Sequence, residues 1–407
     1  MILYIDPGTG SMLFSIVIGL ATALYFVGKA AIIKLKVFFT GGKAIASKNH
    51  VPLVIYSEGT RYWNVFKPVL DELDKRSFST IFYTSSEDDP VFEQNYQFIT
   101  SEFIGQGNKA FARLNFLEAD LCLMTTPGLD VLQLKRSKGV KHYSHILHAV
   151  TDASMYRLFG LDYFDSILLT GEYHETLLRK LEKQRNLPAK EMPVVGCTYL
   201  DVFNEKLKGL SMPENRPFTV LVSPSWGTSG ILSRYGATLL DPLLGTGCSV
   251  IIRPHPQSRQ AERQMLDALR ERYQNERNIE WDEGEENIGT LARADVMISD
   301  FSGIIFDYAF LFDRPVLYIT SDFDHRPYDS YELEEEQWVF RTLPKIGYEL
   351  KPQDFKNIGE IIGQASENEE LSRNRAQAKG ESWQYIGESG KRVVDYLLSK
   401  IESLKEQ

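Results

Sequence analysis

Short apolar runs alternate with stretches of helical spacing along most of this chain. Val51–Ser57 and Thr80–Thr84 are rich in aliphatic, β-branched and aromatic residues, which is typical of buried strands. Between them, apolar side chains in residues 62–74 recur three and four positions apart, and this spacing predicts an amphipathic helix. Strands that alternate with helices in this way predict a mostly parallel sheet, with functional groups at the carboxyl ends of its strands.

The alternation falls into two sets, separated by polar residues 206–217, where Gly209, Pro213 and Pro217 are typical of a linker. Besides the two strands already named, the expected strands lie at 96–104, 121–125, 142–148, 166–170, 194–196, 219–223, 249–253, 279–281, 296–299 and 316–319. The pattern predicts two doubly wound α/β domains over residues 49–205 and 218–354, with a cleft between them. Residues 355–407 have helical periodicity and predict C-terminal helices that pack across one or both domains.

Residues 12–33 are almost entirely apolar, which is marginally long enough to cross a bilayer once. Asp6 is the only charged side chain before this stretch; Lys29 interrupts it, and Lys34, Lys36, Lys43 and Lys48 follow it. The positive-inside rule then predicts a single N-terminal membrane helix within residues 1–48, with the rest of the chain in the cytoplasm. A buried helix, or one lying in the membrane interface, is the alternative.

Composition narrows the class of protein. Of 407 residues, 43% are hydrophobic and 25% are charged, which indicates a globular chain. The formal net charge of −10 argues against a general nucleic-acid binder, because such proteins need a positive field. Three widely spaced cysteines (Cys122, Cys197 and Cys248) form no disulfide framework and favour a reducing compartment.

Three loops after predicted strands of the second domain carry candidate chemistry, and they should meet at one edge of its sheet. They span residues 223–230, 253–256 and 299–303, and supply hydroxyls, a glycine-lined backbone, a cation, an imidazole and a helix N-terminus. Asp300 and Ser302 stand where the helix at 304–312 should be capped. This combination predicts a pyrophosphate site. The candidate donor-binding residues are Ser225, Arg253, Asp300, Ser302, Gly303 and Asp307, and His255 is a candidate catalytic residue.

Histidines mark the first domain. His145 and His148 end a predicted strand, and because strand side chains alternate, His142 and His148 should face one way and His145 the other. An imidazole is the natural general base for a hydroxyl at neutral pH, and Asp152 is a candidate to orient His148. A metal site is a weaker alternative, since the spacing fits no helix-borne ligand pair.

At these residues the chain resembles the CDP-glycerol glycerophosphotransferases, the teichoic-acid primases and polymerases. DVMISDFSGIIFDYAFLFDRPVLYI, at 295–319, is similar to the family block D-x-x-I-T-D-Y-S-S-x-x-F-D-x-x-x-x-x-x-P-x-x-x-Y. His-Pro at 255–256, Pro-Ser-Trp at 224–226 and VGCTYLD at 195–201 match in kind and order. The resemblance implies a GT-B architecture that transfers a polyol phosphate from a CDP-alcohol to a hydroxyl acceptor, lipid-linked, at a membrane. No metal or cofactor is assigned.

The resemblance also implies residue roles. His148 would be the general base; His255 and Arg253 would stabilise the donor pyrophosphate; Ser302 and Gly303 would hold phosphate oxygens. Asp300 or Asp307 would fix the loop or bind glycerol or ribose hydroxyls. We place Glu58, Arg61 and Asp152 on the acceptor side.

Two departures from the family pattern keep other functions open. The family's second serine is Gly303 here, and its H-G-T-x-x-K motif is replaced by residues 148–153, HAVTDA, which retain only the histidine. A glycosyltransferase of the same architecture that uses a UDP- or CMP-sugar is one alternative. A non-enzymatic, membrane-bound scaffold of the same fold is another.

Overall fold

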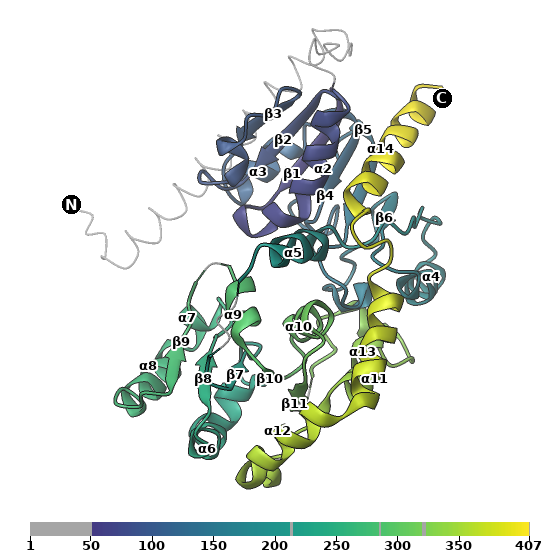
Figure 1. Cartoon of the computed structure of the whole chain (residues 1–407). Helices are drawn as coiled ribbons and strands as arrows, with labels where there is room; N and C mark the ends of the chain where they lie inside the picture. Colours follow the sequence, from purple (N-terminus) through teal and green to yellow (C-terminus); the bar gives the residue numbers. More distant parts are fainter. Residues whose placement is uncertain (1–50, 212–214, 285, 320–322, 407) are drawn as a thin grey trace, which may run out of the picture. The chain divides into compact units, whose positions relative to one another are not determined.

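The computed structural model describes residues 51–211, 215–284, 286–319 and 323–406. These residues build two parallel six-stranded sheets flanked by helices (Figure 1). Most strands are buried on both faces, which is why they appear in the sequence as continuous apolar runs.

The first sheet has the strand order β3-β2-β1-β4-β5-β6. Its strands are β1 (Val51–Ser57), β2 (Thr80–Thr84), β3 (Ile99–Phe103), β4 (Glu118–Met124), β5 (Gly139–Ile146) and β6 (Ser166–Leu168). The helices in this part are α2 (Trp63–Lys75), α3 (Asn108–Leu114) and α4 (Tyr173–Gln184). Neighbouring β1 residues enter different cores, since Val54 packs with Cys122 and Tyr143 while Ile55 packs with Leu121.

The second sheet has the order β12-β11-β10-β7-β8-β9. Its strands are β7 (Thr219–Val222), β8 (Ser249–Ile252), β9 (Ile279–Trp281), β10 (Val296–Ser299), β11 (Val316–Tyr318) and β12 (Tyr348–Glu349). The helices in this part are α6 (Ile231–Gly245), α7 (Ser258–Ala261), α8 (Arg263–Arg272), α9 (Ile288–Arg293), α10 (Ile304–Phe312) and α11 (Trp338–Ile346). Counted from its own first strand, each sheet runs 3-2-1-4-5-6, the order whose switch point binds nucleotides. In the second sheet that switch point lies between β7 and β10.

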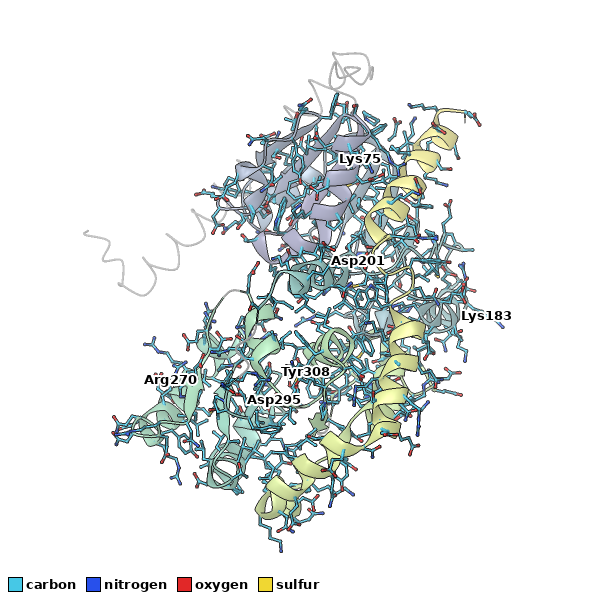
Figure 2. All side chains as sticks on the ribbon, viewed as in Figure 1. Lys75, Lys183, Asp201, Arg270, Asp295 and Tyr308 are labelled. Atoms are coloured by element: carbon cyan, nitrogen blue, oxygen red, sulfur yellow. The ribbon has the colours of Figure 1, made fainter. Side chains whose placement is uncertain are left out.

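The remaining helices are α5 (Thr198–Lys208), α12 (Ile358–Glu367), α13 (Glu369–Ser382) and α14 (Ser389–Lys405). Short 3-10 helices occupy Thr60–Tyr62, Pro90–Glu93, Ala153–Met155, Asp329–Glu332 and Pro352–Asn357. Although α14 is the last helix, its Val393 and Leu397 pack into the first sheet's core with α2. Asp201 on α5 accepts hydrogen bonds from Trp383 Nε1 (2.9 Å) and the backbone amide of Gly387 (2.8 Å), so α5 is joined to the turn before α14 (Figure 2).

Several element predictions need correction. Residues 194–196 form no strand in the sheet, because only one bridge, between Leu169 and Val194, is made there. Residues 206–208 are the last turn of α5 and not linker. Helix α11 was not predicted, since Pro344 lies within it and acidic residues precede it. The predicted membrane helix at 12–33 lies outside the described residues. No helix within the described residues is long and apolar enough to cross a membrane.

Candidate active site

Asp300 ties two of the candidate loops together at the carboxyl end of β10. Its carboxylate is 1% exposed and accepts hydrogen bonds from the backbone amides of Ser225 (3.0 and 3.1 Å) and Ile231 (3.3 Å). It also accepts one from the amide of Ser302 at 3.2 Å. Asp300 and Ser302 therefore do not cap α10 as expected, since the N-cap residue is Gly303, which has no side chain. Burial raises the pKa of Asp300 above its ordinary value, and the hydrogen bonds from these amides oppose that shift.

The remaining candidate loop, residues 253–256 after β8, is held by contacts with neighbouring segments. Arg253 Nη1 forms an ion pair with Asp282 at 2.5 Å, and Nη2 donates to the Gly284 carbonyl at 2.7 Å. His255 Nδ1 accepts from the amide of Gln257 at 3.2 Å, and its ring centre lies 6.4 Å from that of Trp226 in the first loop. Burial lowers the pKa of His255, which keeps this imidazole neutral at neutral pH.

Asp307 and Gly303 both contact residues from the part of the chain that precedes the second sheet. Asp307 is 8% exposed, and its carboxyl is hydrogen-bonded by the Tyr199 hydroxyl of α5. Burial raises the pKa of Asp307 to about 7. The structure thus places the Asp307 carboxyl against Tyr199 of α5. A Cβ on Gly303 would lie 3.3 Å from Thr151 Cγ2, so the 299–303 loop directly contacts the segment after His148.

His148 stands just beyond the end of β5, which ends at Ile146. Its Nδ1 lies 3.1 Å from the Tyr156 hydroxyl, and its ring packs edge-on against Tyr62 with centres 5.4 Å apart. Burial, followed by the charge of Arg61, lowers the pKa of His148 to about 4. The half-buried ring lines a cavity of about 140 Å³, together with Leu147, Ala149, Thr151, Asp152, Met155 and Tyr156.

Asp152, Glu58 and Arg61 were also assigned to the acceptor side, and the structure gives them different contacts. Asp152 does not orient His148; its carboxylate accepts hydrogen bonds from the amides of Trp338 (3.1 Å) and Val339 (2.7 Å) at the start of α11. Tyr156 holds the imidazole instead. Glu58 and Arg61 form an exposed ion pair at 2.9 Å, and the Arg61 guanidinium lies over the ring of Tyr62 at 4.7 Å. This pair therefore lies next to the ring that contacts His148.

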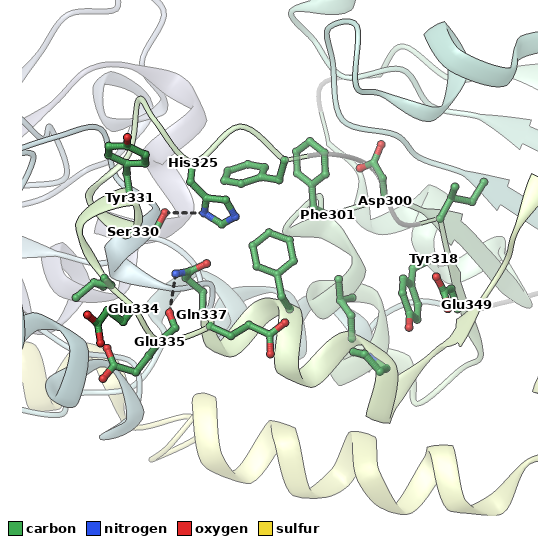
Figure 3. A pocket seen from close by; sticks show the side chains of 17 residues that line it. Asp300, Phe301, Tyr318, His325, Ser330, Tyr331, Glu334, Glu335, Gln337 and Glu349 are labelled. Carbon is green, nitrogen blue, oxygen red and sulfur yellow. Dashed lines mark hydrogen bonds between the residues drawn. The ribbon is translucent and has the colours of Figure 1, made fainter.

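A cavity of about 620 Å³ opens on the other side of the Asp300 loop (Figure 3). Its aromatic and acidic lining residues are Phe301, Tyr318, Phe323, Tyr331, Phe340, Asp300, Glu334, Glu335, Glu336 and Glu349. None of the described residues that line it is lysine or arginine, so this cavity repels a pyrophosphate. In the structure Glu335 pairs with Lys180 of α4, and Glu332 with Arg185.

The fold places the chain in a broad structural class. Solved structures with the same fold include the wall teichoic acid polymerase TagF, as a histidine-to-asparagine variant soaked with CDPG, at a TM-score of 0.53 and 14% identity over 88% of this chain and 90% of that chain. The UDP-GlcNAc 2-epimerase of Neisseria meningitidis has a TM-score of 0.54 at 16% identity over 85% and 99%. A putative epimerase of Listeria monocytogenes reaches 0.57 at 13% over 87% and 98%. The GT-B-like prediction, two Rossmann-like doubly wound domains, is confirmed for the described residues.

A match to a known family covers less than half of the chain. Residues 219–399 match the model of the CDP-Glycerol:Poly(glycerophosphate) glycerophosphotransferase family. The later part of the chain is therefore similar to this family, in agreement with the resemblance of its sequence motifs. No curated protein matches the chain in sequence.

Proposed function

We propose that this protein transfers glycerol phosphate, or another polyol phosphate, from a CDP-activated donor to a hydroxyl acceptor in cell-surface polymer biosynthesis. The family match over residues 219–399 carries the proposal, because that span contains all three candidate loops. Two of these loops follow β7 and β10, the strands at the switch point where doubly wound sheets bind nucleotides, and the third follows β8, the neighbour of β7.

The reaction is an in-line displacement at the phosphorus that bears the polyol. The acceptor oxygen forms the new P–O bond as its hydroxyl proton passes to solvent water, the bond to the bridging pyrophosphate oxygen breaks, and CMP leaves with that oxygen and the bonding electrons. Such a reaction needs positioning and charge stabilisation more than covalent catalysis. The Ser302 hydroxyl and the amide of Gly303 would hold phosphate oxygens, with His255 beside the pyrophosphate. Arg253 would act by fixing the 253–257 loop, because Asp282 already holds its guanidinium.

The acceptor hydroxyl would approach from the His148 cavity. The contact between Gly303 and Thr151 supports this placement, because it sets that cavity directly against the phosphate-binding loop. Within the described part of the chain, His148 Nε2 forms no hydrogen bond, so this nitrogen is available to an acceptor or phosphoryl oxygen. The polyol would extend towards the acidic cavity beside Phe301, whose carboxylates accept hydrogen bonds from hydroxyls and repel phosphate.

The acceptor would be lipid-linked, with the protein attached to the cytoplasmic face of the cell membrane through residues 12–33. The apolar sequence of that segment and the lysines after it support this part of the proposal. A surface-bound enzyme would meet a lipid-linked acceptor without leaving the membrane.

A second candidate is a transferase that uses a UDP-sugar. It is favoured by the likeness to the epimerase structures, one of them bound to UDP-GlcNAc, whose TM-scores equal or exceed that of TagF. The fold alone is common to both activities, so ligand preference must separate them.

The test is a thermal-unfolding screen of the full chain with CDP-glycerol, CDP-ribitol, UDP-GlcNAc and CMP-sialic acid, followed by a CMP-release assay on any hit. A ligand at about 100 times its Kd should stabilise the protein by about 2.7 kcal/mol. We expect stabilisation by a CDP-alcohol, and loss of most of it in His255→Ala.

Arg263→Ala, on the exposed surface of α8, is the matched control and should behave like wild type. Stabilisation by UDP-GlcNAc without any response to CDP-alcohols would replace the proposal with the sugar transferase. No response to any nucleotide would favour the non-enzymatic scaffold.

A further inference from the structure

A chain of three side chains runs from the core of the first sheet to the candidate site. His145 on β5 is 0% exposed, and its Nε2 lies 3.2 Å from the Tyr156 hydroxyl. The same hydroxyl lies 3.1 Å from His148 Nδ1. Both imidazoles meet the phenol ring edge-on, with ring centres 5.2 Å and 6.1 Å away. The Tyr156 hydroxyl is thus held between two histidines, one in the core and one on the cavity.

The three side chains share few polar hydrogens, and the number of these hydrogens limits the hydrogen-bonding arrangements that they can adopt. Burial raises the pKa of the Tyr156 phenol and lowers that of His145 to about 3, so both groups are neutral at neutral pH. His148 is neutral as well, because burial and the nearby charge of Arg61 lower its pKa to about 4. The other titratable groups at this end are Glu58, paired with Arg61, and Tyr62. Each imidazole therefore carries one proton, and the hydroxyl has one to donate.

Among the ring nitrogens and the hydroxyl of these three side chains, His145 Nδ1 is buried without a hydrogen-bond partner in the described part of the protein. If that nitrogen carried the proton, a buried N–H would be left unpaired, which is rarer in proteins than an unpaired acceptor. The favoured state places the His145 proton on Nε2, where it donates to the Tyr156 oxygen. The Tyr156 hydroxyl then donates to His148 Nδ1, and the proton of His148 must be on Nε2. The reverse order would be disfavoured by roughly tenfold or more.

We propose that His145 and Tyr156 are positioning residues that hold His148 in the tautomer with its proton on Nε2, so that His148 presents a hydrogen-bond donor to the substrate. The general base inferred from the sequence requires a lone pair on that nitrogen, whereas this arrangement supplies an N–H group. A fixed neutral donor stabilises the charge on a phosphoryl oxygen. What the donor acts on rests on the proposed function; the tautomer itself does not.

The tautomer is read by two-bond ¹H–¹⁵N correlation spectra of the full chain labelled with ¹⁵N-histidine, without substrate. The seven histidines are assigned by single substitution. We expect His148 of the wild type to be protonated at Nε2. In Tyr156→Phe the donor to Nδ1 is lost, so the fraction protonated at Nδ1 should rise several-fold and the pKa of His148 should rise. His145→Gln keeps a side-chain N–H donor and should preserve the wild-type tautomer better than His145→Leu.

Tyr396→Phe is the matched control, because the Tyr396 hydroxyl also lies beside a histidine, 3.4 Å from His142 Nε2, but on α14 and away from the cavity. It should leave the His148 signals unchanged. A wild-type His148 protonated at Nδ1 overturns the proposal, even if a variant fails to fold. So does a Tyr156→Phe spectrum identical to the wild type at His148. Failure of every nucleotide to bind would overturn the proposed function and leave the tautomer result standing.

Discussion

Asp307 illustrates how the carboxyl of a residue from the most recognisable stretch of the chain can be covered by a segment distant in sequence. The residue is one turn into α10, and its spacing from Asp300 matches the family block, so the resemblance assigned it to donor binding. In the structure Tyr199 covers it, and burial raises the pKa of its carboxyl from 3.8 to about 7. Because helix periodicity gives the face a side chain occupies but not what covers that face, the sequence alone cannot place it.

This burial predicts a pH dependence of stability with a definite sign. Between pH 3.8 and 7 the folded state binds more protons at Asp307 than the unfolded state, so the free energy of unfolding should fall as pH rises through this window. The shift of about three pKa units corresponds to about 4 kcal/mol at most. Asp307→Asn should remove this contribution and stabilise the protein at pH 8.

Denaturant unfolding of wild type and Asp307→Asn at pH 4, 5, 6, 7 and 8 measures the difference. Other buried carboxyls, such as Asp152 and Asp329, cancel in that comparison, since both proteins contain them. Asp267→Asn, on the exposed surface of α8, should leave the pH profile unchanged. Parallel profiles for Asp307→Asn and the wild type would mean that the carboxyl keeps an ordinary pKa.

At the level of elements, the sequence pattern correctly predicted the features that depend on local sequence. The bounds of β10 and α10 are as predicted, because a β-branched run and then a long apolar helix leave no competing period. The strand ends also indicated which loops carry the candidate residues, since parallel strands present their carboxyl ends together. Tyr156 and the aromatic cavity were missed because neither has a local signature; both depend on segments distant in sequence.

Helix α11 also could not be predicted from its local sequence. Its N-terminal amides are satisfied by Asp152, which lies 186 positions earlier in the chain than Trp338. Preceding residues offered no capping side chain, because the N-cap position is Gln337, which makes no side-chain cap. The helix therefore depends on a tertiary contact, and the sequence around it gave no start signal.

Asp152→Ala tests this contact. It should destabilise the protein by about 2 kcal/mol, because it removes an N-cap and leaves two buried amides unpaired. Asn368→Ala is the matched control, since Asn368 caps α13 through the amides of Glu370 and Leu371 at an exposed site. It should cost about 1 kcal/mol or less. Urea unfolding monitored by circular dichroism compares them; equal losses would mean that the Asp152 contact is no stronger than a local cap.

At the level of the whole molecule, distant segments are held together by buried charge and by the last helix. Arg185 forms ion pairs with Asp162 at 2.6 Å, Asp329 at 2.7 Å and Glu332 at 2.8 Å, with most of its side chain buried. Helix α14 completes the first sheet's core. The parts that carry the candidate site are therefore held to each other by contacts between segments distant in sequence, and the proposed attachment through residues 12–33 would tether them to a membrane.

Tethering predicts where the protein is found in a cell. The full chain expressed in a bacterium should remain in the membrane fraction after an alkaline wash. A charged residue at the centre of a membrane helix costs about 2.5–3.5 kcal/mol on insertion scales, so Leu20→Asp combined with Leu24→Asp should release the protein. Immunoblots of the membrane and soluble fractions measure the distribution.

The control is a second pair of leucine-to-aspartate substitutions on the surface of the described part, Leu132→Asp with Leu210→Asp. These add the same charge outside the apolar segment, so the variant should stay in the membrane fraction. Because an amphipathic interfacial helix is held by less apolar area than a spanning one, an alkaline wash that strips the wild type would indicate interfacial attachment. Wild-type protein found in the soluble fraction before any wash would remove the membrane from the proposed function while leaving the donor site untouched.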